Sequence, residues 1–158
     1  MRQFGLIGYP LSHSFSQGYF TEKFLHENEV GLQYTNFPIA SIKDFDDIWV
    51  KQANLQGLNV TIPYKKLVIP FLHHASTVVK KINACNCIRK YNNELYGYNT
   101  DVIGFEKSLA PFLQPHHTHA LILGTGGAAV AVEWVLQKLN INYLLVSRTN
   151  ANANSWES

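Results

Sequence analysis

The pattern of hydrophobic and polar positions predicts short buried strands that alternate with amphipathic helices. One helix is expected to run from Ser14, as its N-cap, to about Asn28, and a shorter one follows Ser41. Another helix is expected over Tyr64–Leu72. The strands predicted in this part of the chain are Arg2–Gly8, Leu32–Pro38, Gly57–Thr61, Ile82–Arg89 and Glu94–Tyr98. The last two should form a hairpin around Asn92-Asn93, because asparagine favours tight turns.

The pattern changes after a polar stretch at residues 116–119, and we place a domain boundary in the Asp101–Thr118 region. A helix is expected from Asp101 to about Leu113, followed by a polar stretch. The segments after it are predicted as a strand, a glycine turn, a helix and a strand: Ala120–Leu123, Gly124–Gly127, Ala128–Leu139 and Tyr143–Ser147. This alternation predicts an α/β protein with a mixed, mostly parallel sheet. We expect one domain over residues 1–100, a connecting helix over 101–117, and a second, incomplete domain over 118–158.

Composition and charge argue against several classes of protein. Of 158 residues, 46% are hydrophobic and 15% charged, which suits a packed domain rather than a disordered chain. The 13 Lys and Arg residues are scattered and the net charge is only +2, so nucleic acid is not an expected partner. The N-terminal apolar run is too short for a signal peptide, and no stretch of ~18 apolar residues predicts a membrane span. We expect a cytoplasmic monomer or homodimer that binds a small molecule and no metal.

The segment Gly124-Thr125-Gly126-Gly127-Ala128-Ala129 fits the dinucleotide-binding pattern G-x-G-x-x-A. The first glycine permits a tight turn and the second lets the backbone approach a pyrophosphate. The small third residue lets helix and strand pack closely, and the helix N-terminus faces the phosphates. Because a strand precedes this turn and a helix follows it, the pattern indicates the start of a Rossmann-type domain rather than a merely tight turn.

The residues after the second strand of this unit, Ser147-Arg148-Thr149, bear on the choice of cofactor. An acidic residue there would bind the ribose hydroxyl of NAD, whereas an arginine accommodates the 2′-phosphate of NADP. The guanidinium matches phosphate geometry and the neighbouring hydroxyls can add donors. NADP is therefore the expected cofactor, although Arg148 could instead be a solvated surface residue.

Four polar motifs precede the glycine turn, at expected strand ends where ligands bind in open α/β sheets. Each also has an ordinary structural explanation: a helix cap for the serines and the aspartate, solvation for the lysine, and a satisfied core amide for the second asparagine. The residues are Ser14 and Ser16; Asn59, Thr61 and Lys65; Asn86; and Asp101.

In this order, the motifs Ser-x-Ser, Asn-x-Thr-x-Pro-x-Lys, Asn and Asn-Thr-Asp-x-x-Gly ahead of an NADP-type turn resemble the shikimate dehydrogenase family from Phe4 to Thr149. The resemblance implies a substrate domain followed by a nucleotide domain, and NADPH-dependent reversible reduction of 3-dehydroshikimate to shikimate in aromatic amino-acid biosynthesis. Carried over, Ser14 and Ser16 would hold the substrate carboxylate. The residues that would bind its hydroxyls are Asn59, Thr61, Asn86 and Asp101. Lys65 would sit against the reacting C3 oxygen, paired with Asp101 as the acid/base couple.

The chain departs from the family in two places. Cys85-Asn86-Cys87 stands where the family usually has Val-Asn-Thr, which exchanges one small side chain for another. The sequence also stops soon after Tyr143–Ser147, whereas family members continue, so we expect a C-terminally truncated chain that is inactive alone. The alternatives are a quinate/shikimate dehydrogenase with relaxed substrate or cofactor choice and, for these residues alone, a non-catalytic shikimate-binding module.

Overall fold

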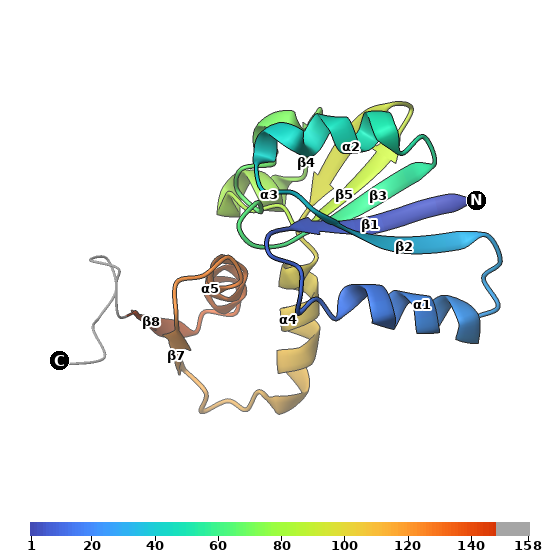
Figure 1. The fold of residues 1–158 in the computed structure, drawn as a ribbon. Coiled ribbons are helices and arrows are strands. Elements are labelled where there is room, and N and C mark those ends of the chain that lie inside the picture. The colour runs from blue at the N-terminus through green and yellow to red at the C-terminus, as the bar shows by residue number, and fades with distance from the viewer. Residues whose placement is uncertain (148–158) are drawn as a thin grey trace. The chain divides into compact units, whose positions relative to one another are not determined.

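The computed structural model describes residues 1–147, which fold as two compact units that meet between Tyr98 and Asn99 in the sequence. The first unit contains one six-stranded sheet (Figure 1). Its strands are β1 (Arg2–Gly8), β2 (Leu32–Pro38), β3 (Leu55–Val60), β4 (His74–Ala75), β5 (Cys87–Tyr91) and β6 (Glu94–Tyr98). The strand order is β2-β1-β3-β5-β6-β4. Strand β5 is antiparallel to both neighbours and the other pairings are parallel, which confirms the predicted mixed, mostly parallel sheet.

Helices cover both faces of this sheet. They are α1 (Ser16–His26), α2 (Phe45–Lys51) and α3 (Thr77–Ile82), with 3-10 turns at Ile42–Asp44 and Ile69–Phe71. Helix α1 lies on one side of the sheet, and α2 and α3 lie on the other (Figure 1). Between the sheet and α2 lies a core whose most deeply buried side chains include Ile7, Phe45, Leu55, Val68 and Val79, each with 0% exposure. Full burial of such a side chain contributes about 1.5–3 kcal/mol, so this core holds the sheet edge in place.

Two local predictions are confirmed. Ser41 caps the helical segment that follows it, since its hydroxyl accepts a hydrogen bond from the Lys43 N–H at 3.3 Å. Strands β5 and β6 form the expected hairpin, in which Asn92 and Asn93 have φ values of 50° and 62°. Two consecutive left-handed residues are what a two-residue hairpin loop requires, and asparagine tolerates them better than most residues.

The expected helix over Tyr64–Leu72 is wrong. The segment instead forms a series of turns that ends in the 3-10 turn Ile69–Phe71. Its hydrogen bonds include short-range ones, such as the Phe71 N–H to the Val68 carbonyl at 3.1 Å. Pro70 explains the difference, because it has no N–H to donate and its ring clashes with the preceding helical turn.

The expected strand Ile82–Arg89 is also wrong at its beginning. The residues before Asn83 form α3, whose N-terminus is capped by the Ser76 hydroxyl, an acceptor from the Val79 N–H at 3.3 Å. Asn83 ends the helix in the left-handed region with φ 52°, and β5 starts only at Cys87. The serine cap and the left-handed asparagine therefore define a helix that includes Ile82, and the strand starts later than predicted.

The second unit contains a strand, a helix and a second strand in the predicted order. Its elements are α4 (Asp101–Leu109), a 3-10 turn at Ala110–Phe112, β7 (His119–Leu123), α5 (Ala129–Lys138) and β8 (Asn142–Val146). Strands β7 and β8 pair in parallel, and the fully or nearly buried Ile122, Ala129, Leu136 and Ile141 form its core. Helix α4 ends earlier than predicted, since Pro111 cannot continue it. Within residues 1–147 no helix is long and apolar enough to cross a membrane.

Candidate active site

Polar side chains gather where β1 and β3 end. The loops after these strands line a cavity of ≈ 460 Å³, to which Ser14, Ser16 and Thr61 all contribute. Main-chain hydrogen bonds tie the loops together: the Thr61 N–H donates to the Ile7 carbonyl at 2.9 Å, and the Tyr9 N–H donates to the Ile62 carbonyl at 3.0 Å. The cavity is thus built on the sheet and has the size of a small-molecule site.

Ser14 does not cap α1, contrary to the expectation. The helix begins at Ser16 with Phe15 in the cap position, while the Ser14 N–H donates to the Leu11 carbonyl at 3.0 Å. The Ser14 Oγ is buried and finds no hydrogen-bond partner among the residues that the structure describes. A buried hydroxyl without a partner is energetically unfavourable.

The main chain brings Lys65 and Asn86 to the same edge. The Lys65 carbonyl accepts from the Cys85 N–H at 2.7 Å, directly before Asn86. The Asn86 N–H in turn donates to the Tyr98 carbonyl at 3.0 Å, and the Asn86 carbonyl accepts from the Val60 N–H at 2.9 Å. Asn86 is 8% exposed. Lys65 lies in the series of turns after β3 rather than in a helix.

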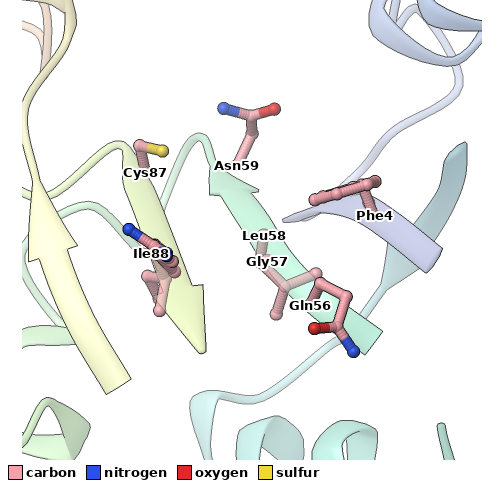
Figure 2. A pocket seen from close by; sticks show the side chains of 9 residues that line it. Phe4, Gln56, Gly57, Leu58, Asn59, Cys87 and Ile88 are labelled. Atoms are coloured by element: carbon pink, nitrogen blue, oxygen red, sulfur yellow. The ribbon is translucent and has the colours of Figure 1, made fainter. Parts of the chain in front are cut away.

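Asn59 stands near the carboxyl end of β3, between Phe4 on β1 and Cys87 on β5 (Figure 2). Its Oδ1 accepts a hydrogen bond from the Tyr34 hydroxyl at 2.8 Å. Burial raises the pKa of Tyr34 to about 12, and a hydrogen bond with the Ser16 side chain acts in the opposite direction. Tyr34 was not predicted as a site residue from the sequence. Its signal would have been a polar tip on the alternating strand β2, on the side that α1 covers.

Asp101 is the first residue of α4 in the second unit, three positions after β6 ends. It is not the N-cap of this helix, which was the ordinary structural explanation for an aspartate at this position. Thr100 occupies the cap position, and the Asn99 Oδ1 accepts from the Val102 N–H at 3.3 Å. Asn99, which is 4% exposed, therefore supplies the side-chain hydrogen bond at this helix start.

The two cysteines are free thiols. Burial raises the pKa of Cys85 to about 11 and also raises the pKa of Cys87 above the ordinary thiol range. A thiol that stays protonated is a poor nucleophile and a poor metal ligand, so neither cysteine has the electrostatics of a reactive group. Within residues 1–147, no three His, Cys, Asp or Glu side chains are grouped so as to hold a metal ion.

The glycine turn Gly124–Gly127 joins β7 to α5. Gly124 has φ 108°, a left-handed conformation that glycine adopts readily, and its N–H donates to the Val146 carbonyl at 2.8 Å. A methyl group added at Gly126 would meet no described atom within 4 Å, which leaves room beside the backbone for a ligand. Ala129, at the third position of the pattern, is 8% exposed and packs in the core of this unit.

The turn and the end of β8 are linked by the Thr125 hydroxyl, which donates to the Ser147 Oγ at 3.4 Å. This contact joins two of the predicted cofactor-binding positions. The open backbone at Gly126 and the start of α5 suit a pyrophosphate. Arg148 and Thr149, the predicted partners of the 2′-phosphate, lie outside the described residues.

Comparison with known proteins gives one consistent family. Residues 6–88 match the shikimate dehydrogenase substrate binding domain. The chain is 36% identical over 157 residues to the shikimate dehydrogenase (NADP(+)) of Pyrococcus abyssi, covering 99% of this chain and 58% of that protein. The crystal structure of shikimate dehydrogenase 1 from Peptoclostridium difficile superposes with a TM-score of 0.85 at 34% identity, over 98% of this chain and 60% of that one.

The Thermus thermophilus shikimate 5-dehydrogenase in complex with shikimate superposes with a TM-score of 0.82 at 25% identity, over 94% of this chain and 57% of that one. The chain thus spans a little over half the length of the relatives that it matches. The family match covers more than half of the chain and agrees with the sequence motifs and the mixed sheet. This chain therefore belongs to the shikimate dehydrogenase family.

Proposed function

We propose that the protein reduces 3-dehydroshikimate reversibly to shikimate, with NADPH as the hydride donor. The observation that carries this proposal is the cavity where β1 and β3 end, lined by Ser14, Ser16 and Thr61. A main-chain hydrogen bond from Cys85 to the Lys65 carbonyl holds Lys65 and the adjacent Asn86 at the same edge. The names of the relatives support it: the P. abyssi protein is an NADP(+) enzyme, and the T. thermophilus enzyme was crystallised with shikimate.

In this proposal the substrate carboxylate occupies the cavity beside Ser14 and Ser16. The hydroxyls are donors, and the N-terminus of the eleven-residue α1 starts at Ser16, where backbone N–H groups and the helix dipole favour an anion. The buried Ser14 Oγ then gains the partner that it lacks in the described chain. The substrate hydroxyls bind the side chains of Asn59, Thr61, Asn86 and Asp101.

Lys65 supplies the proton in the proposed reaction. Negative charge grows on the C3 oxygen as the carbonyl carbon is reduced, and a positioned ammonium stabilises that charge and can transfer its proton to it. Asp101 is proposed to orient the ammonium and to accept a hydrogen bond from a substrate hydroxyl. NADPH, when bound, supplies the hydride.

The proposed cofactor site is the turn before α5 together with the end of β8. Its residues are Gly124, Thr125, Gly126, Gly127, Ala128, Ser147, Arg148 and Thr149. The open space at Gly126 would admit the pyrophosphate, and Arg148 would bind the 2′-phosphate that distinguishes NADP from NAD.

A steady-state assay of the full-length protein tests the function. Shikimate and quinate are each offered with NADP and with NAD. We expect the highest kcat/KM for shikimate with NADP. Equal use of quinate would instead establish the relaxed quinate/shikimate activity. Binding of shikimate with no turnover under any of the four conditions would refute the proposed reaction and leave a binding module.

We propose the cytoplasm as the place of this activity. The free thiols of Cys85 and Cys87 suit a reducing compartment, and NADPH-dependent reduction requires a pool of that cofactor. Fractionation of cells that express the protein at its natural level, followed by immunoblotting, tests this expectation.

A further inference from the structure

Tyr34 is held rigidly beside the proposed substrate site. It lies on β2 with 4% of its surface exposed. Its ring stacks on Phe20 of α1, with the ring centroids 4.5 Å apart and the planes at 14°. An aromatic ring that is buried and stacked in this way has little freedom, so the position of its hydroxyl is fixed by the packing of α1 on the sheet.

The Tyr34 hydroxyl connects two residues of the proposed site. It donates to the Asn59 Oδ1 at 2.8 Å, and its interaction with the Ser16 side chain lowers the pKa of the same hydroxyl. The three residues come from three elements, β2, β3 and the start of α1. The Tyr34 hydroxyl thereby links Asn59 on the sheet to the first residue of the helix that begins at the cavity.

The direction of the bond at Asn59 matters because a carboxamide has one accepting and one donating end. With its oxygen bound by Tyr34, Asn59 turns its nitrogen away from Phe4 and toward the Cys87 side of β3 (Figure 2). The reverse orientation would direct N–H groups at Tyr34 and present the oxygen instead. In the observed orientation the Tyr34 hydroxyl holds the Asn59 oxygen, and the end of the carboxamide that remains open is the donating one.

We propose that Tyr34 is a positioning residue that locks the Asn59 carboxamide, so that the site offers N–H donors and selects a ligand with an acceptor oxygen at this point. This inference rests on the proposed function for the identity of the ligand, shikimate, while the lock itself is a property of the free chain. An amide held before binding loses less conformational freedom when the ligand arrives, which favours affinity.

Tyr34→Phe tests the lock because it removes the hydroxyl and keeps the ring that stacks on Phe20. Tyr19→Phe is the matched control, since Tyr19 lies on α1 next to Phe20 but is 46% exposed. In the ligand-free chain, NMR relaxation of the Asn59 side-chain N–H groups should show a lower order parameter in Tyr34→Phe than in the wild type or in Tyr19→Phe. An unchanged order parameter in Tyr34→Phe would overturn the inference.

Calorimetric titration with shikimate then measures the consequence. Loss of one hydrogen bond of ordinary strength should weaken binding about fivefold in Tyr34→Phe. If Tyr34 acts through Asn59, adding Tyr34→Phe to Asn59→Ala should cause no further loss, whereas additive losses would show that the hydroxyl acts by another route, such as Ser16, and would overturn the inference. If the wild-type chain binds no shikimate, the proposed function fails for this ligand, and the order parameter still decides whether Tyr34 locks Asn59.

Discussion

Replacement of Ser14 by alanine should stabilise the free chain and weaken ligand binding at the same time. The Ser14 Oγ is buried and has no hydrogen-bond partner among the described residues. Removing such a hydroxyl relieves a desolvation penalty of about 1 kcal/mol, so the free energy of unfolding should rise by up to that amount. A hydrogen bond from the same hydroxyl to a carboxylate is worth about 1.5–3 kcal/mol, so shikimate binding should weaken about 10- to 150-fold.

The assay pairs urea unfolding, followed by circular dichroism, with calorimetric titration of shikimate. Ser76→Ala is the control, because the Ser76 hydroxyl caps α3 and accepts from the Val79 N–H at 3.3 Å. Loss of that cap should lower the free energy of unfolding by about 1 kcal/mol and leave shikimate binding unchanged.

Two results would refute the reasoning on Ser14. A loss of stability as large as that of Ser76→Ala would mean that the Ser14 hydroxyl is satisfied in the free chain. Unchanged affinity for shikimate would mean that the ligand carboxylate is not held by this side chain. Since the two measurements are predicted to move in opposite directions, a general loss of folding cannot imitate the expected result.

Three further predictions concern the reaction, the cofactor and alkaline stability. In the full-length protein Lys65→Ala should lower turnover at least about 10²-fold with little change in shikimate affinity; near-normal turnover would refute its assignment. Arg148→Ala should raise the KM for NADP and leave that for NAD nearly unchanged, whereas equal losses would make Arg148 structural. Burial raises the pKa of Cys85 to about 11, so its stabilising effect is full below the unfolded thiol pKa of about 8.5 and disappears as pH rises to 11. The fall in urea midpoint over this window should be smaller in Cys85→Ala, and equal slopes would contradict the cause.

The parts of the fold that follow from local chemistry are predictable from the sequence. Asn92 and Asn93 tolerate positive φ, and with strand segments on both sides this is enough to specify the β5–β6 hairpin. The glycine turn before α5 is equally local, because Gly124 adopts a left-handed conformation and Ala129 allows close packing. In both cases a few adjacent residues determine the backbone, and tertiary contacts only add to their preference.

The wrong secondary-structure predictions arise where single residues decide the backbone conformation against the composition of their neighbours. Pro70 prevents a regular helix after Tyr64, although the apolar spacing there is helical. Ser76 and Asn83 enclose a helix that takes in Ile82, the first residue of the predicted strand. Tyr34 was missed for a different reason: its role depends on a hydrogen bond to Asn59, 25 residues away, and a pairing of that kind has no signature in one sequence.

The convergence of the site residues depends on the direction of one strand. Asn59, Thr61 and Lys65 lie at or just after the end of β3, so their place at the carboxyl edge follows from any parallel arrangement. Asn86 precedes its strand and would lie at the opposite edge if β5 ran parallel to β3. Because β5 is antiparallel, its beginning meets the end of β3, and Asn86 exchanges main-chain hydrogen bonds with Val60 and Tyr98. The hairpin at Asn92-Asn93 then returns the chain, so that β6 ends at the same edge. The local turn that the sequence specifies thus places the end of β6, whereas the antiparallel pairing of β5 with β3 is a long-range feature that the strand pattern leaves undecided.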